Sequence, residues 1–270
     1  MLGIDVGCSP GKRSSAVCRL DWDAGAVRWT IRRFRATPEE RADTIGALAD
    51  RPLLAAAFDG PLRRGLDEIG AYRKAERMLT LGFQPLIGKP GQSSSPVGRS
   101  LNTHANLCAQ AVAATGHVAP AEHAEAIHPQ AIVEAFPSAW LGMLIADPAV
   151  LGATRKDRSD LFYRHLADTG GLGTVLARLL PGRQAAEPFA VVSNHDDRAA
   201  LICAMTALGV AARDYRSVGD DQGWIILPPP ALIQPWVRDQ LQANAQRCAK
   251  SALTGAQRSA GRLAPQQPAA

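Results

Sequence analysis

Apolar residues form short continuous runs at three widely separated places in the chain. The runs 2–6, 53–58 and 131–136 contain almost only apolar residues, and each predicts a strand that is buried on both faces of a sheet. None of the runs approaches the roughly 20 residues that a membrane-spanning helix needs. We therefore expect a water-soluble core built around three central strands, with no membrane partner.

Between the first two runs, the pattern is first that of a hairpin and then that of a helix. Segments 14–22 and 26–35 predict two strands joined by the turn Asp23-Ala24-Gly25. Thr37 is a typical N-cap residue, and Pro and Glu residues follow it, so a helix is expected from there to about Ala49. A helical crossover between strands favours their parallel pairing.

The second half of the chain predicts further helices and one late strand. Four segments have helix-like periods: 65–81, 101–114, 160–168 and 194–212. Segment 223–228 predicts a short strand, and the Gly-, Pro- and Ser-rich segment 83–98 predicts a long loop of the kind that often carries function. Together these elements predict an α/β domain over residues 1–243. Residues 244–270, rich in Ala, Gln, Ser and Arg, predict a disordered basic tail.

The composition of the chain indicates the size of the domain and the cellular compartment in which to expect it. The chain has 270 residues, of which 46% are hydrophobic, which is enough for one large domain. Its five cysteines are widely spaced and contain no C-x-x-C pair, so reduced thiols and no zinc site are expected. The first residues lack the features of a secretory signal. These observations predict a cytoplasmic protein.

The net charge of +5 suggests nucleic acid as a partner, but most of this charge lies at one end of the chain. From residue 240 onward there are four cations and no acid, namely Arg247, Lys250, Arg258 and Arg262. They leave a charge of only +1 on the rest of the chain. The basic character therefore belongs largely to the expected tail.

Asp5 and Asp59 are the first candidates for chemistry. Asp5 lies within one buried strand and Asp59 directly follows another. A single carboxylate in such a place is often a hydrogen-bonded structural group. Two carboxylates at the carboxyl ends of neighbouring strands lie where open α/β sheets carry their sites, and they would repel each other unless a cation neutralised them.

Glu134, Asp196 and Asp197 are further acidic candidates. Glu134 lies in the third strand, where an exposed side chain is the alternative explanation. Asp196 and Asp197 open the helix at 194–212, where an N-cap and helix-dipole role also suits them. The five acids together suit hard divalent cations such as Mg²⁺ or Mn²⁺, which can activate water for phosphodiester hydrolysis.

Three basic residues are weaker candidates for binding substrate phosphate. Lys12 lies in a Gly- and Ser-containing turn that only partly matches a P-loop, because three residues separate its glycines and Arg13 follows the lysine. Arg73 and Arg77 lie in the predicted helix at 65–81, where salt bridges or solvation would also explain them.

The order of short motifs along residues 2–229 resembles domain-of-unknown-function family 429, whose members are described as predicted nucleases with a ribonuclease H-like fold. The motifs are Gly3-Ile4-Asp5-Val6-Gly7, Phe58-Asp59-Gly60-Pro61-Leu62, Val133-Glu134-Ala135-Phe136-Pro137, Asp196-Asp197-Arg198-Ala199-Ala200-Leu201-Ile202-Cys203-Ala204 and Gly223-Trp224-Ile225-Ile226-Leu227-Pro228. Each is short, and their joint order is more specific than any one of them.

The resemblance implies a ribonuclease H-like mixed sheet, antiparallel in its first three strands and then parallel, flanked by helices. It also implies a divalent-metal site made by Asp5, Asp59, Glu134 and an acid on the late helix. Two positions depart from the family pattern: Ala199 stands where that acid is usual, and Gln222 where another acid precedes the last Gly-Trp. Asp196 or Asp197 would then have to supply the missing carboxylate.

Three functions follow as hypotheses. The first is a metal-dependent nuclease or phosphodiesterase in which Asp5, Asp59, Glu134 and Asp197 are catalytic, with DNA or RNA left open as substrate. The second is an ATP-dependent phosphotransferase of the actin and sugar-kinase superfold, whose phosphate loop the start of the chain also fits. The third is a non-catalytic ribonuclease H-like binding module that has lost part of its site, as Ala199 suggests.

Overall fold

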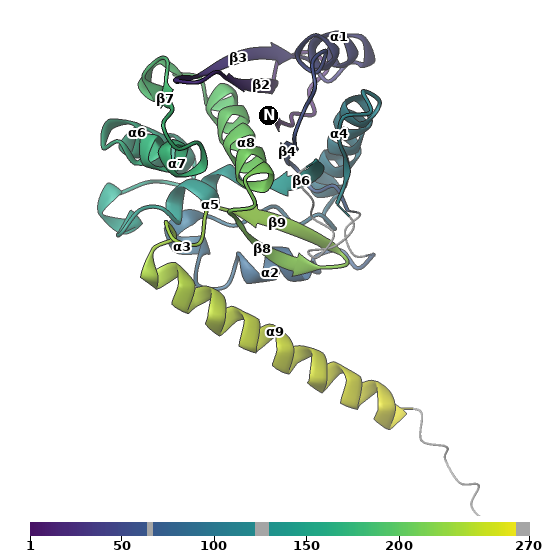
Figure 1. Ribbon diagram of the computed structural model, residues 1–270. Helices are drawn as coiled ribbons and strands as arrows, with labels where there is room; N and C mark the ends of the chain where they lie inside the picture. The colour runs from purple at the N-terminus through teal and green to yellow at the C-terminus, as the bar shows by residue number, and fades with distance from the viewer. Residues whose placement is uncertain (64–66, 122–129, 263–270) are drawn as a thin grey trace, which may run out of the picture.

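One mixed β-sheet runs through the middle of the protein, with helices on both of its faces (Figure 1). The computed structural model describes residues 1–63, 67–121 and 130–262, and for residues 251–262 it describes the backbone alone. Within these residues the sheet has nine strands: β1 Leu2–Asp5, β2 Ser15–Trp22, β3 Ala26–Phe34, β4 Ala56–Asp59, β5 Ala119–Pro120, β6 Ala131–Ala135, β7 Gln184–Ala185, β8 Arg216–Asp220 and β9 Gly223–Leu227.

The strand order is β7-β3-β2-β1-β4-β6-β9-β8, and β5 pairs with β6. The first three strands pair in antiparallel fashion, whereas β1, β4, β6 and β9 are parallel neighbours. The predicted α/β class is therefore confirmed, as is a sheet that is antiparallel at its start and parallel in its centre. The last strand pair departs from the prediction, because β8 pairs with β9 in antiparallel fashion.

The helices complete two layers around this sheet. Their bounds are α1 Pro38–Leu48, α2 Lys74–Met78, α3 Gln84–Ile87, α4 Pro96–Ala113, α5 Pro137–Gly142, α6 Arg158–Asp168, α7 Gly171–Leu179, α8 His195–Ala211 and α9 Pro235–Arg262. One face of the sheet packs against α1 and α4 around a smaller core, and the other packs against α8 around a larger core. None of the helices that the structure describes combines the length and apolar character needed to cross a membrane.

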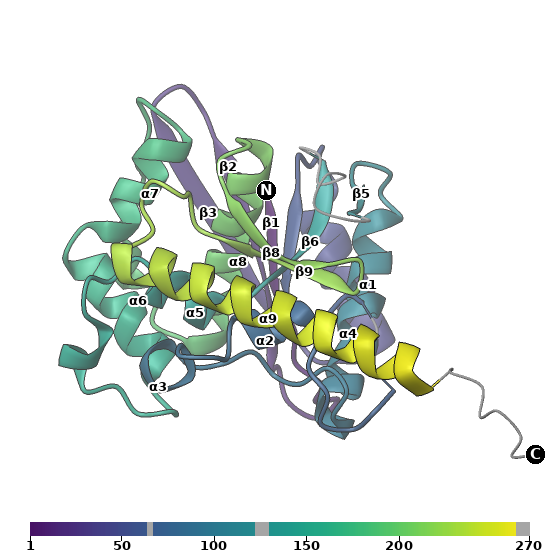
Figure 2. The ribbon, with the colours of Figure 1, turned by 90° about the horizontal axis from the view of Figure 1, so that it is seen from below.

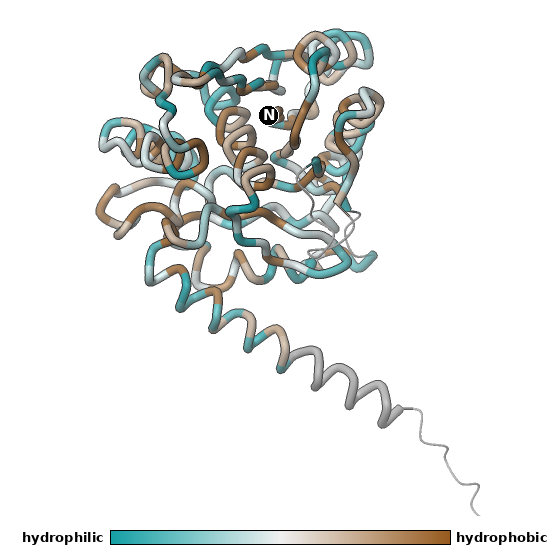
Figure 3. The backbone as a smooth tube through the Cα atoms, in the orientation of Figure 1, coloured by the Kyte–Doolittle hydropathy of each residue, from teal (hydrophilic) through white to brown (hydrophobic). Residues whose placement is uncertain are grey.

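Helix α8 lies directly on the central strands because its residues and those of β1 allow a close approach. Almost every residue from Ala199 to Val210 is buried, and Figure 3 shows the apolar residues along this helix. Gly3 of β1 has no side chain, and a Cβ atom there would collide with the backbone of Ala200 and Ala204. A glycine at this position therefore sets how near α8 comes to the sheet.

Helix α1 begins as the sequence predicted. The Thr37 side chain accepts a hydrogen bond from the backbone N–H of Glu40, at 3.3 Å. The first predicted strand, the hairpin and the strand predicted at 131–136 are also confirmed within a residue or two, whereas β4 begins later than expected, at Ala56.

Two predictions for the middle of the chain were wrong in extent. The helix expected at 65–81 is reduced to α2, because Gly70 has a φ of +92° and the preceding residues form turns; residues 64–66 lie outside the described part. The long loop expected at 83–98 contains α3 and the first turn of α4.

The boundary between a domain and a disordered tail was placed too early. Helix α9 continues through residue 243 to Arg262, and Figures 1 and 2 show it beside α2 before it projects from the body. Asn244 is buried and donates to the backbone oxygens of Met78 and Leu81, at 2.8 and 2.6 Å. Because this side chain caps the backbone near α2, the domain extends beyond residue 243; residues 263–270 lie outside the described part.

Candidate active site

Asp5 and Asp59 lie side by side at the carboxyl ends of two parallel strands. In the pairing of β1 with β4, Asp5 is in register with Asp59. Residues in register on parallel strands direct their side chains to the same face, and for this pair it is the face that α8 covers, because Gly3 two residues earlier touches α8. The structure therefore brings these two acids together, as expected.

The two carboxylates have no compensating partner. Neither makes a hydrogen bond or an ion pair with any residue that the structure describes. Burial, followed by the charges of Asp59, Asp196 and Asp197, raises the pKa of Asp5 well above its usual value. Burial also raises the pKa of Asp59 to about 7, although the nearby His195 acts in the opposite direction. The pair is therefore costly to ionise as it stands.

Asp196 and Asp197 bring further negative charge to the same place from the start of α8. The Asn194 side chain caps this helix by accepting from the backbone N–H groups of both residues, at 2.9 and 3.3 Å, so their own side chains are not the caps. Burial raises the pKa of both, and Arg33 opposes the shift. The Oδ1 atom of Asp197 is buried without a hydrogen bond, 3.6 Å from Arg33 Nε.

Glu134 does not belong to this acidic group. In the pairing of β4 with β6 it is in register with Phe58, whereas Asp59 is in register with Ala135. Alternation along the strands therefore directs Glu134 to the face opposite Asp59. Glu134 is only 4% exposed, so the alternative of a solvent-facing residue is wrong as well.

Arg73 forms an ion pair with Glu134, which explains why this acid can be buried. Two guanidinium nitrogens donate to the two Glu134 oxygens at 2.9 Å each, and Arg73 Nε donates to Glu76 at 2.9 Å. Glu134 Oε1 also accepts from the backbone N–H groups of Leu62 and Arg63, at 2.8 and 3.1 Å. Arg73 is only 2% exposed and its guanidinium is held by Glu76, Glu134 and the backbone oxygen of Gln222, so its expected role in phosphate binding is not supported.

The two departures from the family pattern have different surroundings. The backbone oxygen of Gln222 accepts from Arg73 at 3.2 Å, so this position supports the buried ion pair through its main chain. Ala199 lies one helical turn after His195 and borders the same cavity as Asp59. An acid at this position would have faced the cavity, and the small apolar residue leaves that wall uncharged.

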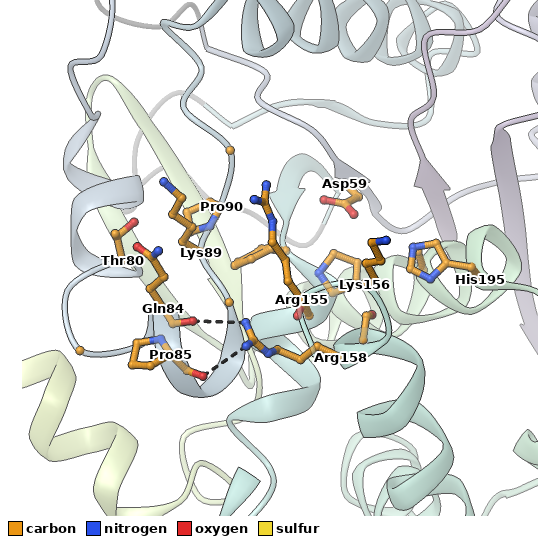
Figure 4. Close-up of a pocket in the computed structure, with 18 of the residues that line it drawn as sticks. Asp59, Thr80, Gln84, Pro85, Lys89, Pro90, Arg155, Lys156, Arg158 and His195 are labelled. Carbon is orange, nitrogen blue, oxygen red and sulfur yellow. Dashed lines mark hydrogen bonds between the residues drawn. The ribbon is translucent and has the colours of Figure 1, made fainter. Parts of the chain in front are cut away.

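A cavity of about 900 Å³ opens beside Asp59 (Figure 4). Its walls come from the segment around α3, the start of α5, the loop before α6 and the first turn of α8. A second cavity of about 80 Å³ lies between Asp59 and the Arg73–Glu134 pair. Asp59 thus borders both cavities and connects the acid pair to solvent.

Basic side chains line the larger cavity, and the sequence reading missed them. They are Lys89, Arg155, Lys156 and Arg158. The signals were present, because 155–158 is a cluster of three cations and Lys89 lies in the segment that was expected to be functional. Lys12 and Arg77, the residues that were expected to bind phosphate, are exposed and do not line this cavity.

His195 also borders the cavity and was not predicted. It is the first residue of α8, and its Nδ1 atom lies 3.2 Å from Asp160 Oδ2. Asp160 is in turn held by Arg198 at 2.9 Å. This contact orients the imidazole and leaves Nε2 as the ring nitrogen available for a proton transfer.

The acidic side chains of the site can be tested for their fit to a metal ion. Within the described residues, no three His, Cys, Asp or Glu side chains converge in a manner that would enclose a metal. Two carboxylates at one strand edge do fit Mg²⁺ or Mn²⁺, because such ions often take one or two protein carboxylates and fill their other positions with water and substrate phosphate. Asp5 and Asp59 are the residues with this chemistry.

The geometry therefore combines an uncompensated acid pair, an oriented histidine and a cavity with basic walls. Searches of protein-family models, of curated proteins and of solved structures found no match to this chain.

Proposed function

We propose that this protein is a metal-dependent phosphoester hydrolase of the ribonuclease H-like kind, a nuclease or phosphodiesterase, with Asp5 and Asp59 as the residues that hold Mg²⁺ or Mn²⁺. One observation carries the proposal. The carboxylates of Asp5 and Asp59 lie at the carboxyl ends of two neighbouring strands and have no cationic or hydrogen-bonding partner among the described residues. A divalent cation would remove their repulsion, whereas a structural role would require partners such as those of Glu134.

The divalent ion, when bound, supplies a Lewis acid for a phosphoryl oxygen and a more acidic water molecule. The other functions fall to the side chains of the protein. Asp5 and Asp59 hold the ion, the charge of Asp197 acts on Asp5, and the cavity beside Asp59 receives the substrate. His195, oriented by Asp160, can take up or release a proton at Nε2.

Titration of Mn²⁺ into the full chain, followed by calorimetry, tests the first step. We expect the wild type to bind the ion and both Asp5→Asn and Asp59→Asn to lose binding. Asp43→Asn is the matched control, because Asp43 is exposed on α1 and lies outside the cavity. The same four proteins should then be assayed with DNA, RNA and small phosphodiesters in the presence of Mn²⁺.

One observation favours a second candidate, the non-catalytic binding module. Ala199 occupies the wall beside Asp59 where the family pattern has an acid, so the site has fewer carboxylates than that pattern implies. Absence of divalent binding at millimolar concentration would support the module and contradict the hydrolase. Binding of Mn²⁺ with equal hydrolysis by the wild type and Asp5→Asn would contradict the catalytic assignment alone.

A further inference from the structure

The charge of the cavity beside Asp59 is strongly one-sided. Of the described residues that line it, four are permanent cations, Lys89, Arg155, Lys156 and Arg158, and Asp59 is the single carboxylate. One carboxylate can cancel at most one of these four charges. The cavity therefore has a net positive charge that no residue of its own walls balances.

The four cations fall into two groups by their contacts. Arg158 donates to the backbone oxygens of Gln84 and Pro85, at 3.2 Å each, and Lys89 donates to the Tyr72 hydroxyl at 2.8 Å. These two are held by the protein. The side chains of Arg155 and Lys156, in contrast, make no hydrogen bond or ion pair with any described residue.

Arg155 and Lys156 lie on the loop before α6, and Figure 4 draws them extending into the space that Asp59 and His195 also border. An unpaired cation on a convex surface is ordinarily just solvated. Within a concave wall, several like charges focus their field on the enclosed space and raise the local concentration of anions. The pair is therefore placed to bind an anionic group beside the acid pair.

We infer that this cavity binds a terminal phosphate group, a phosphomonoester, through Arg155 and Lys156. A monoester carries nearly two negative charges at neutral pH and matches two unpaired cations, whereas each phosphodiester of a nucleic-acid backbone carries one. Arginine and lysine are the side chains that bind phosphate best, the first as a fork and the second as a point charge.

The size of the cavity agrees with this class of ligand. A volume of about 900 Å³ lies within the usual range of sites for small molecules and cofactors and leaves room for a nucleotide. The inference rests on the proposed function, because it assigns a substrate class to the same cavity. The phosphate can belong to a free nucleotide or to the end of a nucleic-acid strand, and both present the same group.

The test measures binding without divalent ions, so that it does not depend on the metal chemistry. Adenosine 5′-monophosphate and adenosine are titrated into the full chain in the presence of a chelator. We expect the wild type to bind the monophosphate at least about tenfold more tightly than the nucleoside, which is the effect of one good charge-assisted contact. Equal affinity for the two would overturn the inference.

The double variant Arg155→Gln/Lys156→Gln assigns the effect to residues. We expect its Kd for the monophosphate to rise by about 10- to 100-fold, with the Kd for adenosine unchanged. The matched control Lys74→Gln/Arg238→Gln removes two exposed cations outside the cavity and should change neither Kd. Equal losses in both double variants would show a general charge effect and contradict the assignment. Urea unfolding of each variant confirms that both remain folded.

Asp59→Asn provides a signature that a nonspecific basic surface would not give. Because Asp59 is the carboxylate facing the bound anion, its removal should tighten metal-free binding of the monophosphate by about tenfold or less. Weaker binding by Asp59→Asn would count against the proposed position of the phosphate.

Oligonucleotides distinguish the two sources of the group. A short strand with a 5′-phosphate should compete with the monophosphate if the ligand is a strand end, and should fail to compete if it is a free nucleotide; either result supports the inference. Equal competition by the same strand with a 5′-hydroxyl would overturn it. Loss of Mn²⁺ binding with intact phosphate binding would remove the proposed hydrolase and leave the phosphate site.

Discussion

Two acidic sites on opposite faces of one sheet differ in how their charge is balanced. On one face, Glu134 is buried and every oxygen is engaged, by Arg73 and by two backbone N–H groups. On the other, Asp5 and Asp59 face each other without a partner among the described residues. Three strands that are neighbours in the sheet thus carry one neutralised and one uncompensated site.

The difference shows that burial of an acid does not by itself indicate function. All three residues looked alike along the chain, as carboxylates in or beside an apolar run. Their partners separate them, because a buried ion pair with all its hydrogen bonds is a structural unit. An acid pair without partners stores a repulsion that a bound cation or proton relieves. The following predictions test this contrast.

The largest effect is expected from breaking the balanced site. Arg73→Met would leave Glu134 buried and unpaired, which should lower the free energy of unfolding by about 3–5 kcal/mol. Urea denaturation measures this loss. Because Arg73 also pairs with the buried Glu76, replacing all three groups, in Arg73→Met/Glu76→Gln/Glu134→Leu, should recover much of the loss. A loss below about 1 kcal/mol in the single variant would mean that the pair is not a structural unit.

The uncompensated pair should respond to pH in the opposite way to an ordinary salt bridge. Because the pKa of Asp59 is raised from 3.8 to about 7, the folded state keeps its proton where the unfolded state has lost it. Its contribution to stability is therefore fully present below about pH 4 and is lost as the pH rises through about 7.

The variant Asp59→Asn isolates this response. It should be about as stable as the wild type near pH 4 and more stable near pH 8, by on the order of 4 kcal/mol. Urea denaturation of both proteins across this range gives the comparison. Parallel pH profiles for the two proteins would show that the carboxyl group is not strained in the fold.

A divalent cation should stabilise the wild type through the same pair. At ten times its Kd, Mg²⁺ should raise the free energy of unfolding by about 1.4 kcal/mol. Thermal unfolding with and without Mg²⁺ measures the shift, and Asp5→Asn should show none. Asp43→Asn should behave as the wild type, and an equal shift in Asp5→Asn would locate the ion elsewhere.

The smallest effect concerns the start of α8. Asn194→Ala removes the side chain that caps the first turn, which should cost about 1 kcal/mol of stability. It should also loosen the segment that carries His195, Asp196 and Asp197, so that Mn²⁺ affinity falls with the stability. Asn194→Asp keeps the cap and should retain the stability of the wild type.

Local pattern was sufficient for most elements of the fold. The apolar runs predicted β1 and β6, the turn residues predicted the β2–β3 hairpin, and Thr37 predicted the start of α1. The same reasoning failed at 65–81 and after residue 243. At the first of these, the positive φ of Gly70 ends the helical conformation of the backbone. At the second, Asn244 holds helix α9 against residues near α2, which are distant in sequence.

By itself, the sequence determined an α/β sheet and the meeting of Asp5 with Asp59, since parallel central strands bring their carboxyl ends to one edge. Only the tertiary structure decided that Glu134 faces Arg73 on the other side and that Arg155, Lys156 and His195 border one cavity with Asp59. The physical reason is that strand register and helix packing set which side chains share a face, and the partners of a charge come from segments far away in the chain.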